Sequence, residues 1–283
     1  MEERKRVLFP DLSANAFVTD ADRKALAALE AVPLLPQVLR KFSELGLDRW
    51  YYCLNMSMSV RCGPRQYPTV YGIFQEATRI LDMPEPELYI SSNPFPNAFA
   101  GGVERPYVTL RNSMLDTLTD EQLYHLIGHE LGHVKAGHML YRMVGRLLLP
   151  LLQALGRRLP ILGDAAAISL ALAFYEWFRQ SEFSCDRAGL LVSQNLEDSL
   201  RANLALTAGP NRFSNEESFE VFMEQARIYQ EATPLDQLGK IILFFAGNWA
   251  FTHPMPVARA QALEKWAESG DYAKILHGIY PRN

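Results

Sequence analysis

The chain has 283 residues, of which 48% are hydrophobic and 21% are charged. This composition is typical of a folded globular protein and excludes the disordered, collagen-like and disulfide-stapled classes. Basic residues number 28 and acidic residues 32. The chain therefore lacks the positive surface that binding to a phosphate backbone requires, and we expect no nucleic-acid partner.

The sequence has no internal repeat and no linker rich in Pro, Gly or Ser. We therefore predict one domain over 1–283, in which an N-terminal helical extension (1–67) packs on a core (68–283). The three cysteines lack C-x-x-C spacing, which favours a reducing compartment over a disulfide framework. The first residues include no apolar run of signal-peptide length, so we expect a cytoplasmic protein.

Apolar residues are concentrated between 147 and 178, in a region that could be taken for a membrane segment. Arg157, Arg158, Asp164 and Glu176 interrupt it, and no run of about 20 apolar residues is left for a span. A buried core helix explains this region better. Peripheral membrane contact through 145–178 is the alternative to a purely cytoplasmic location.

The spacing of apolar residues predicts helices at both ends of the chain and strands between them. Two short helices are expected within 20–43 and a third over 69–81. Three β-type segments follow, separated by NPFP and GGVER: 87–91, 97–103 and 106–110. From residue 118 onward the pattern predicts helices over 119–142, 165–194, 196–207, 216–231, 235–250 and 256–268. The predicted class is α+β, mainly helical with one small antiparallel sheet.

The helix that begins at the capping box of Thr119 and Gln122 contains the sequence His129-Glu130-Leu131-Gly132-His133. Residues four apart share one face of a helix, so both imidazoles can bind one tetrahedral zinc ion. Glu130 lies one step further round, where its carboxylate can take a proton from the attacking water. We therefore predict one zinc ion per chain, with Glu130 as general base.

Two other histidines lie close to this motif in the sequence. His125 is on the same stripe, but it lies about 12 Å from His133 along the helix, too far to share an ion. His138 follows His133 by five residues, which places it about 140° away from the ligand face. It is predicted to end the helix or to support a ligand rather than to bind the metal.

A catalytic zinc site needs a third protein ligand, which must come from another part of the chain. Glu182 and Asp186 are four residues apart, within a sequence too apolar for an exposed acidic face. Buried carboxylates need partners, and a metal site supplies them. We predict Glu182 as the third ligand, and Asp186 as the acceptor of a hydrogen bond from the far ring nitrogen of His129.

Four segments in order carry a resemblance to the M48 peptidase family, the zinc-dependent gluzincins that include prenyl-protein and HtpX-type proteases. They are PNAFAGG (96–102), EQLYHLIGHELGHVKAGH, SEFSCDRAG and THPMPVAR (252–259). The likeness covers about residues 68–268 and implies a gluzincin-like fold. It also implies the roles given above to His129, Glu130, His133, Glu182 and Asp186.

The resemblance implies further roles outside the zinc helix. His253 matches a histidine that stabilises the tetrahedral intermediate, and Arg259 an arginine that orients this region. Asn97 and Ala98 match an edge segment along which substrate backbone lies, and an edge strand can capture an extended peptide by strand addition. The membrane-bound relatives have spans before and after the zinc motif. This chain lacks segments of that length there, so the resemblance does not transfer their membrane or prenylated substrates.

The leading hypothesis is a zinc metalloendopeptidase that acts on unfolded or extended polypeptides. The alternative is a latent zinc protein of the same family, in which 139–178 covers the site and the chain holds peptides like a chaperone. The intact Glu130 favours the enzyme, because loss of catalysis would be expected to remove it. A purely structural zinc site is disfavoured, because three ligands and a base describe an open site.

Overall fold

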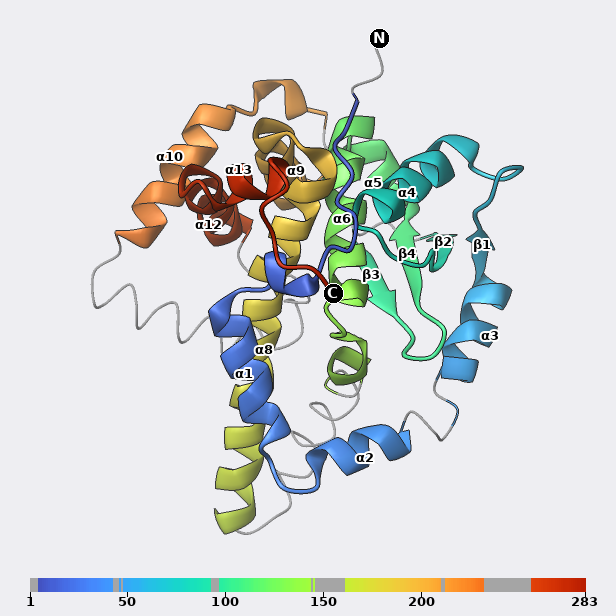
Figure 1. The fold of residues 1–283 in the computed structure, drawn as a ribbon, viewed down its shortest axis with the longest axis vertical. Coiled ribbons are helices and arrows are strands. Elements are labelled where there is room, and N and C mark those ends of the chain that lie inside the picture. The colour runs from blue at the N-terminus through green and yellow to red at the C-terminus, as the bar shows by residue number, and fades with distance from the viewer. Residues whose placement is uncertain are drawn as a thin grey trace.

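The computed structural model describes most of the chain, and its elements are shown in Figure 1. The described residues are 5–42, 46, 48–92, 97–143, 145, 161–209, 212–231 and 256–283.

The N-terminal part of the chain contains three short helices, α1 (Asp20–Glu30), α2 (Leu35–Phe42) and α3 (Asp48–Met58). Thr19 caps α1, because its side chain accepts a hydrogen bond from the backbone N–H of Asp22. Leu34, with a φ of 65°, separates α1 from α2. The prediction of two short helices within 20–43 is confirmed, whereas α3 was not predicted.

A small sheet follows, and helix α4 (Pro68–Ile80), which comes between its first two strands in the chain, packs against the later helix at 120–135. Its strands are β1 (Ser59–Arg61), β2 (Glu87–Ser91), β3 (Ala98–Gly101) and β4 (Tyr107–Arg111), in the order β1-β2-β4-β3. The α+β class is confirmed, but the sheet is mixed rather than wholly antiparallel. Strands β3 and β4 form an antiparallel hairpin, and this hairpin places β4 beside β2 in the same direction.

The second half of the described chain is helical, as predicted, but its short helices at 112–117 and 271–276 were not among the predicted ones. Its elements are α5 (Asn112–Thr117), α6 (Asp120–Lys135), α8 (Ile161–Ser193), α9 (Leu196–Ala208), α10 (Phe219–Gln230), α12 (Pro256–Glu268) and α13 (Asp271–Leu276). The helix predicted to reach residue 142 ends instead at Lys135, because Gly137 has a φ of 72° and turns the chain before helix resumes at 139. The predicted helix 235–250 lies outside the described residues.

Helix α6 lies between the sheet and α8, and α1 lies alongside α8 (Figure 1). Glycines on α6 allow the two long helices to pack closely. A Cβ added to Gly128 would lie 2.6 Å from Cβ of Val192 and 3.0 Å from Cα of Gly189, and one added to Gly132 would lie 2.7 Å from Cβ of Ala188. These glycines let α6 approach the part of α8 that carries Glu182 and Asp186.

The close contact between α6 and α8 allows a prediction about the stability of the fold. Gly128→Ala is expected to lower the free energy of unfolding by about 1–3 kcal/mol, because backbone and a β-branched side chain must move to admit one methyl group. Gly72→Ala in α4 is the matched control. An added Cβ there meets nothing within 4 Å, so the better helix propensity of Ala should stabilise by about 0.5–1 kcal/mol. Urea unfolding of both variants measures the difference, and equal effects would refute the close-packing argument.

The two ends of the chain are joined to each other and to the helices. The backbone N–H of Ser13 donates to Pro281, that of Asn283 to Asp11, and that of Phe9 to Ile80 at the end of α4. The Arg6 guanidinium pairs with Glu121 of α6 at 2.6 Å. Among the described helices, none has the length and apolar character needed to cross a membrane.

Candidate metal centre

Three predicted ligands from two helices meet in the structure. His129 and His133 project from α6 toward Glu182 of α8. Nε2 of His129 lies 3.2 Å from Oε2 of Glu182, and Nε2 of His133 lies 3.3 Å from Oε1. Ligand atoms about 2.0–2.1 Å from a tetrahedral ion are about 3.3 Å apart. These residues therefore fit a zinc ion, and the donor set of two imidazoles and one carboxylate is that of a catalytic site.

The outer nitrogen of His129 faces a buried ion pair. Its Nδ1 lies 3.0 Å from Oδ1 of Asp186, and Arg259 of α12 donates to both oxygens of that carboxylate, at 2.5 and 2.8 Å. Burial raises the pKa of Asp186, but Arg259 outweighs burial and holds this pKa below its usual value. The carboxylate stays charged and orients His129 with Nε2 toward the ligand set.

The two ligand imidazoles have opposite pKa shifts. Burial lowers the pKa of His129, but hydrogen bonds with Asp186 and Glu182 raise it to about 9. Burial and the charge on Arg142 hold the pKa of His133 well below its usual value. His133 is thus held in the neutral form, which is the form of an imidazole that can bind a metal ion.

Arg142 is a residue of this site that the sequence analysis missed. Its Nη1 donates to Oε1 of Glu182 at 2.7 Å and lies 2.8 Å from Nε2 of His133. The guanidinium is buried and supplies a positive charge beside the Glu182 carboxylate. Arg142 reaches the site because helix resumes after Gly137, so no spacing counted from the H-E-x-x-H motif would have placed it.

The ligand set is enclosed. His129, His133, Glu182 and the predicted base Glu130 are each at most 1% exposed. A separate apolar cluster lies close to the site, since Trp177 makes an edge contact with His138 at 5.5 Å between ring centres. Its buried members are Leu29, Leu35, Leu39, Tyr141, Phe174 and Trp177, drawn from α1, α2, α8 and the chain after His138. Trp177, with its cluster neighbours Tyr141 and Phe174, therefore brings part of the 139–178 segment close to the candidate metal centre.

Of the other predicted site residues, the structure describes Asn97 and Ala98 but not His253. Ala98 is buried on β3, which is the edge strand next to β4 and contacts α6. Asn97 precedes this strand and accepts a hydrogen bond from the backbone N–H of Arg111 at its carbonyl. His253 lies outside the described residues. His125 does not belong to the ligand set; its Nε2 lies 3.8 Å from Oδ1 of Asp186.

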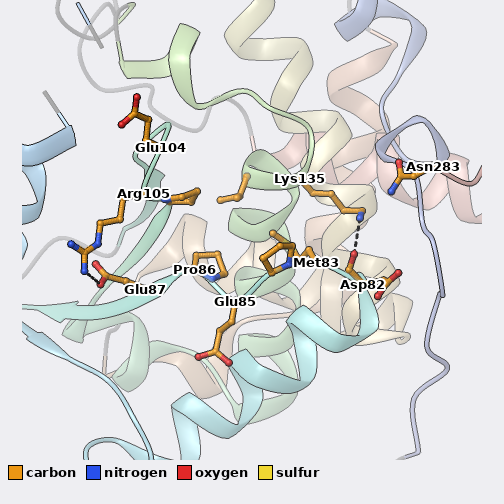
Figure 2. A pocket seen from close by; sticks show the side chains of 12 residues that line it. Asp82, Met83, Glu85, Pro86, Glu87, Glu104, Arg105, Lys135 and Asn283 are labelled. Carbon is orange, nitrogen blue, oxygen red and sulfur yellow. Dashed lines mark hydrogen bonds and ion pairs between the residues drawn. The ribbon is translucent and has the colours of Figure 1, made fainter. Parts of the chain in front are cut away.

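A surface cavity of about 450 Å³ opens elsewhere, at the C-terminal end of α6 (Figure 2). Lys135 and Asp82 lie on one side of it, where Nζ of Lys135 donates to the Asp82 carbonyl. Arg105 and Glu87 form an ion pair on the other side, at 2.6 Å. None of the three ligand residues lines this cavity, so it is distinct from the metal centre.

Comparison with known proteins gives one family. The profile of peptidase family M48 matches residues 64–267. The chain is 29% identical to the plastoglobule-localized metallopeptidase 48 of Arabidopsis thaliana, a chloroplast protein, over 273 residues that make up 95% of this chain and 77% of that one. HtpX protease homologues of Sulfurovum sp. and Moorella thermoacetica are 41% and 34% identical over 73 and 74 residues. Each of these two matches covers 25% of this chain and about a quarter of the homologue. No solved structure matches the chain.

Proposed function

Because the chain belongs to peptidase family M48, we propose that it is a zinc-dependent metalloendopeptidase that cleaves unfolded or extended polypeptides. The observation that carries this proposal is the meeting of His129, His133 and Glu182 at the spacing of a tetrahedral ion, with Glu130 on the same helix. We further propose one zinc ion per chain and a single domain over 1–283.

The chemistry follows from the residues around the ligands. When bound, zinc acidifies water and polarises a carbonyl oxygen. Glu130 accepts the proton of the attacking water and delivers it to the leaving amine. Asp186, held by Arg259, keeps His129 in the tautomer that turns Nε2 inward. His253 is the proposed donor to the developing oxyanion.

Substrate binding is assigned to the edge of the sheet. Strand β3 is an edge strand beside α6, the helix that carries His129 and His133. An extended peptide can add to such an edge by main-chain hydrogen bonds. We assign this role to Asn97 and Ala98. Recognition through the backbone would favour unfolded chains and would place little demand on their sequence.

The burial of the ligands favours one second candidate. A peptide cannot reach residues that are at most 1% exposed unless neighbouring segments move. A latent protein of the same family, which holds peptides without cleaving them, would also have an enclosed site. The two candidates differ in turnover, not in zinc content.

Digestion of a peptide library tests the proposal. We expect cleavage that a chelator abolishes and that added Zn²⁺ restores, with no strong preference at any single position. A chain that binds one zinc ion but leaves the library intact would support the latent protein. Cleavage that persists at full rate without metal would refute the metallopeptidase.

The cellular location of the chain is also proposed from its sequence. We propose a cytoplasmic protein, with peripheral membrane contact through 145–178 as the alternative. The Arabidopsis relative is named for the plastoglobule of the chloroplast, so that alternative has to be tested. Cell fractionation with and without a high-salt wash separates the two locations, since peripheral contact would leave the chain in the membrane pellet before the wash.

A further inference from the structure

A second buried chain of polar contacts begins at the other ligand histidine. Nδ1 of His133 lies 3.1 Å from Nδ1 of His138, and Nε2 of His138 lies 3.3 Å from Oδ2 of Asp22 on α1. All three residues are at most 1% exposed. The chain therefore links a ligand on α6 to a carboxylate in the N-terminal helical extension.

The proton positions along these contacts follow from the ligand role of His133. If Nε2 of His133 faces a metal ion, its ring proton is on Nδ1, which must donate to His138. Nδ1 of His138 is then the acceptor, so the proton of His138 is on Nε2 and is donated to Asp22. With His133 in this role, one arrangement of tautomers satisfies both the contact between His133 and His138 and the contact between His138 and Asp22, and it ends on an anion.

Asp22 is held in place for this contact. The hydroxyl of Ser184 on α8 donates to the same Oδ2 at 2.6 Å, and the backbone N–H of Asp22 donates to Thr19 at the start of α1. Among the described residues, the imidazole of His138 is the titratable group that lies within hydrogen-bonding distance of the Asp22 carboxylate. A buried carboxylate without such a partner would be costly, so the imidazole and the carboxylate stabilise each other.

The two ligand histidines are thus supported in parallel. His129 reaches the carboxylate of Asp186 directly, at 3.0 Å. His133 reaches the carboxylate of Asp22 through one intervening imidazole. Partners in this position fix the tautomer and the ring orientation of a ligand, and their loss typically weakens metal binding by about 10–100-fold.

We propose that Asp22 is a positioning residue of the metal centre, which acts through His138 to orient His133 toward the metal. The inference rests on the proposed ligand set. It makes the N-terminal extension part of the metal site, although Asp22 touches neither the metal nor the substrate.

The same atoms allow one rival arrangement. His133, His138 and Cys185 could together hold a second metal ion, because Sγ of Cys185 lies 3.8 Å from Nδ1 of His138. His133 would then have to bridge two ions with both nitrogens and give up its ring proton. The hydrogen-bonded chain avoids this loss and explains the contact with Asp22, so we favour it. The experiment distinguishes the two.

The test measures metal affinity rather than activity, in the full-length chain. Zinc affinity is determined by competition with a chelating dye for wild type, Asp22→Asn, Asp22→Leu, His138→Phe and the double variant Asp22→Leu/His138→Phe. We expect Asp22→Leu to weaken zinc binding by about 10–100-fold. Asp22→Asn keeps an acceptor of the same shape but loses the charge, so its loss should be smaller. In the His138→Phe background, Asp22→Leu should have no further effect.

Thr19→Ala is the matched control, because it removes the cap of the same helix and leaves the carboxylate in place. A merely structural role for Asp22 predicts that Thr19→Ala weakens zinc binding as much as Asp22→Leu does. Cobalt substitution adds a second measurement, since the d–d spectrum should change in the Asp22 variants and stay unchanged in Thr19→Ala.

Besides an equal loss in Thr19→Ala, three results would overturn the inference: unchanged affinity in both Asp22 variants, additive effects of Asp22→Leu and His138→Phe, or two cobalt ions per chain with a thiolate charge-transfer band. If wild type binds no zinc, the proposed function itself fails. If it binds zinc and the Asp22 variants bind equally well, only the inference fails.

Discussion

Glu130→Gln is expected to lower the peptidase rate by about 10²–10⁴-fold, the usual contribution of a general base. Gln keeps the size and polarity of the side chain but cannot accept a proton from water. The residue is fully buried on α6 next to His129. Zinc content should stay near one ion per chain, because Glu130 is not among the proposed ligands.

The measurement combines a fluorogenic peptide assay with metal analysis of the same samples. Glu176→Gln is the control, since Glu176 lies on α8 and forms an exposed pair with Arg179. It should retain full activity. A Glu130→Gln variant as active as wild type would refute the mechanism, whereas an inactive variant without zinc would assign Glu130 to the metal site instead.

Local patterns in the sequence predicted most elements correctly, and the errors have physical causes. The capping box at Thr119 and Gln122 is present at the start of α6, as predicted. The mixed sheet could not be read from the strands themselves, because pairing between β2 and β4 depends on how the chain crosses between them. Helix α3 was not predicted, and its Trp50 and Met58 are exposed rather than packed in the core.

The site was predictable where its chemistry depends on spacing within one helix. His129 and His133 share a face of α6, and Glu182 and Asp186 share a face of α8. Arg142 and Asp22 were not predictable, because a turn at Gly137 and the docking of α1 on α8 bring them to His133 and His138. The close approach of α6 to α8 has a signal in the sequence, because the glycines at 128 and 132 are four residues apart and share one face of α6.

Arg259→Met should be the most destabilising of the substitutions considered, with a loss of about 3–5 kcal/mol in the free energy of unfolding of the metal-free protein. Arg259 is 5% exposed and is the cation that pairs with both oxygens of Asp186. Met fills a similar volume, so the loss reports the charge rather than a cavity. In this variant the Asp186 carboxylate still has the energetic cost of burying its charge, and no guanidinium offsets that cost.

A double variant shows whether this loss comes from the unpaired charge. Arg259→Met combined with Asp186→Asn removes both charges and leaves an acceptor for His129, so it should be more stable than Arg259→Met alone.

Arg201→Met is the control for an exposed pair. Arg201 lies 2.8 Å from Glu197 on the surface of α9, and its loss should cost below about 1 kcal/mol. If urea unfolding gave the Arg259 and Arg201 variants equal losses, the buried pair would not hold α12 against the metal centre. Chelator-treated wild type provides the baseline for all three variants, because bound metal would add its own stabilisation to the folded state.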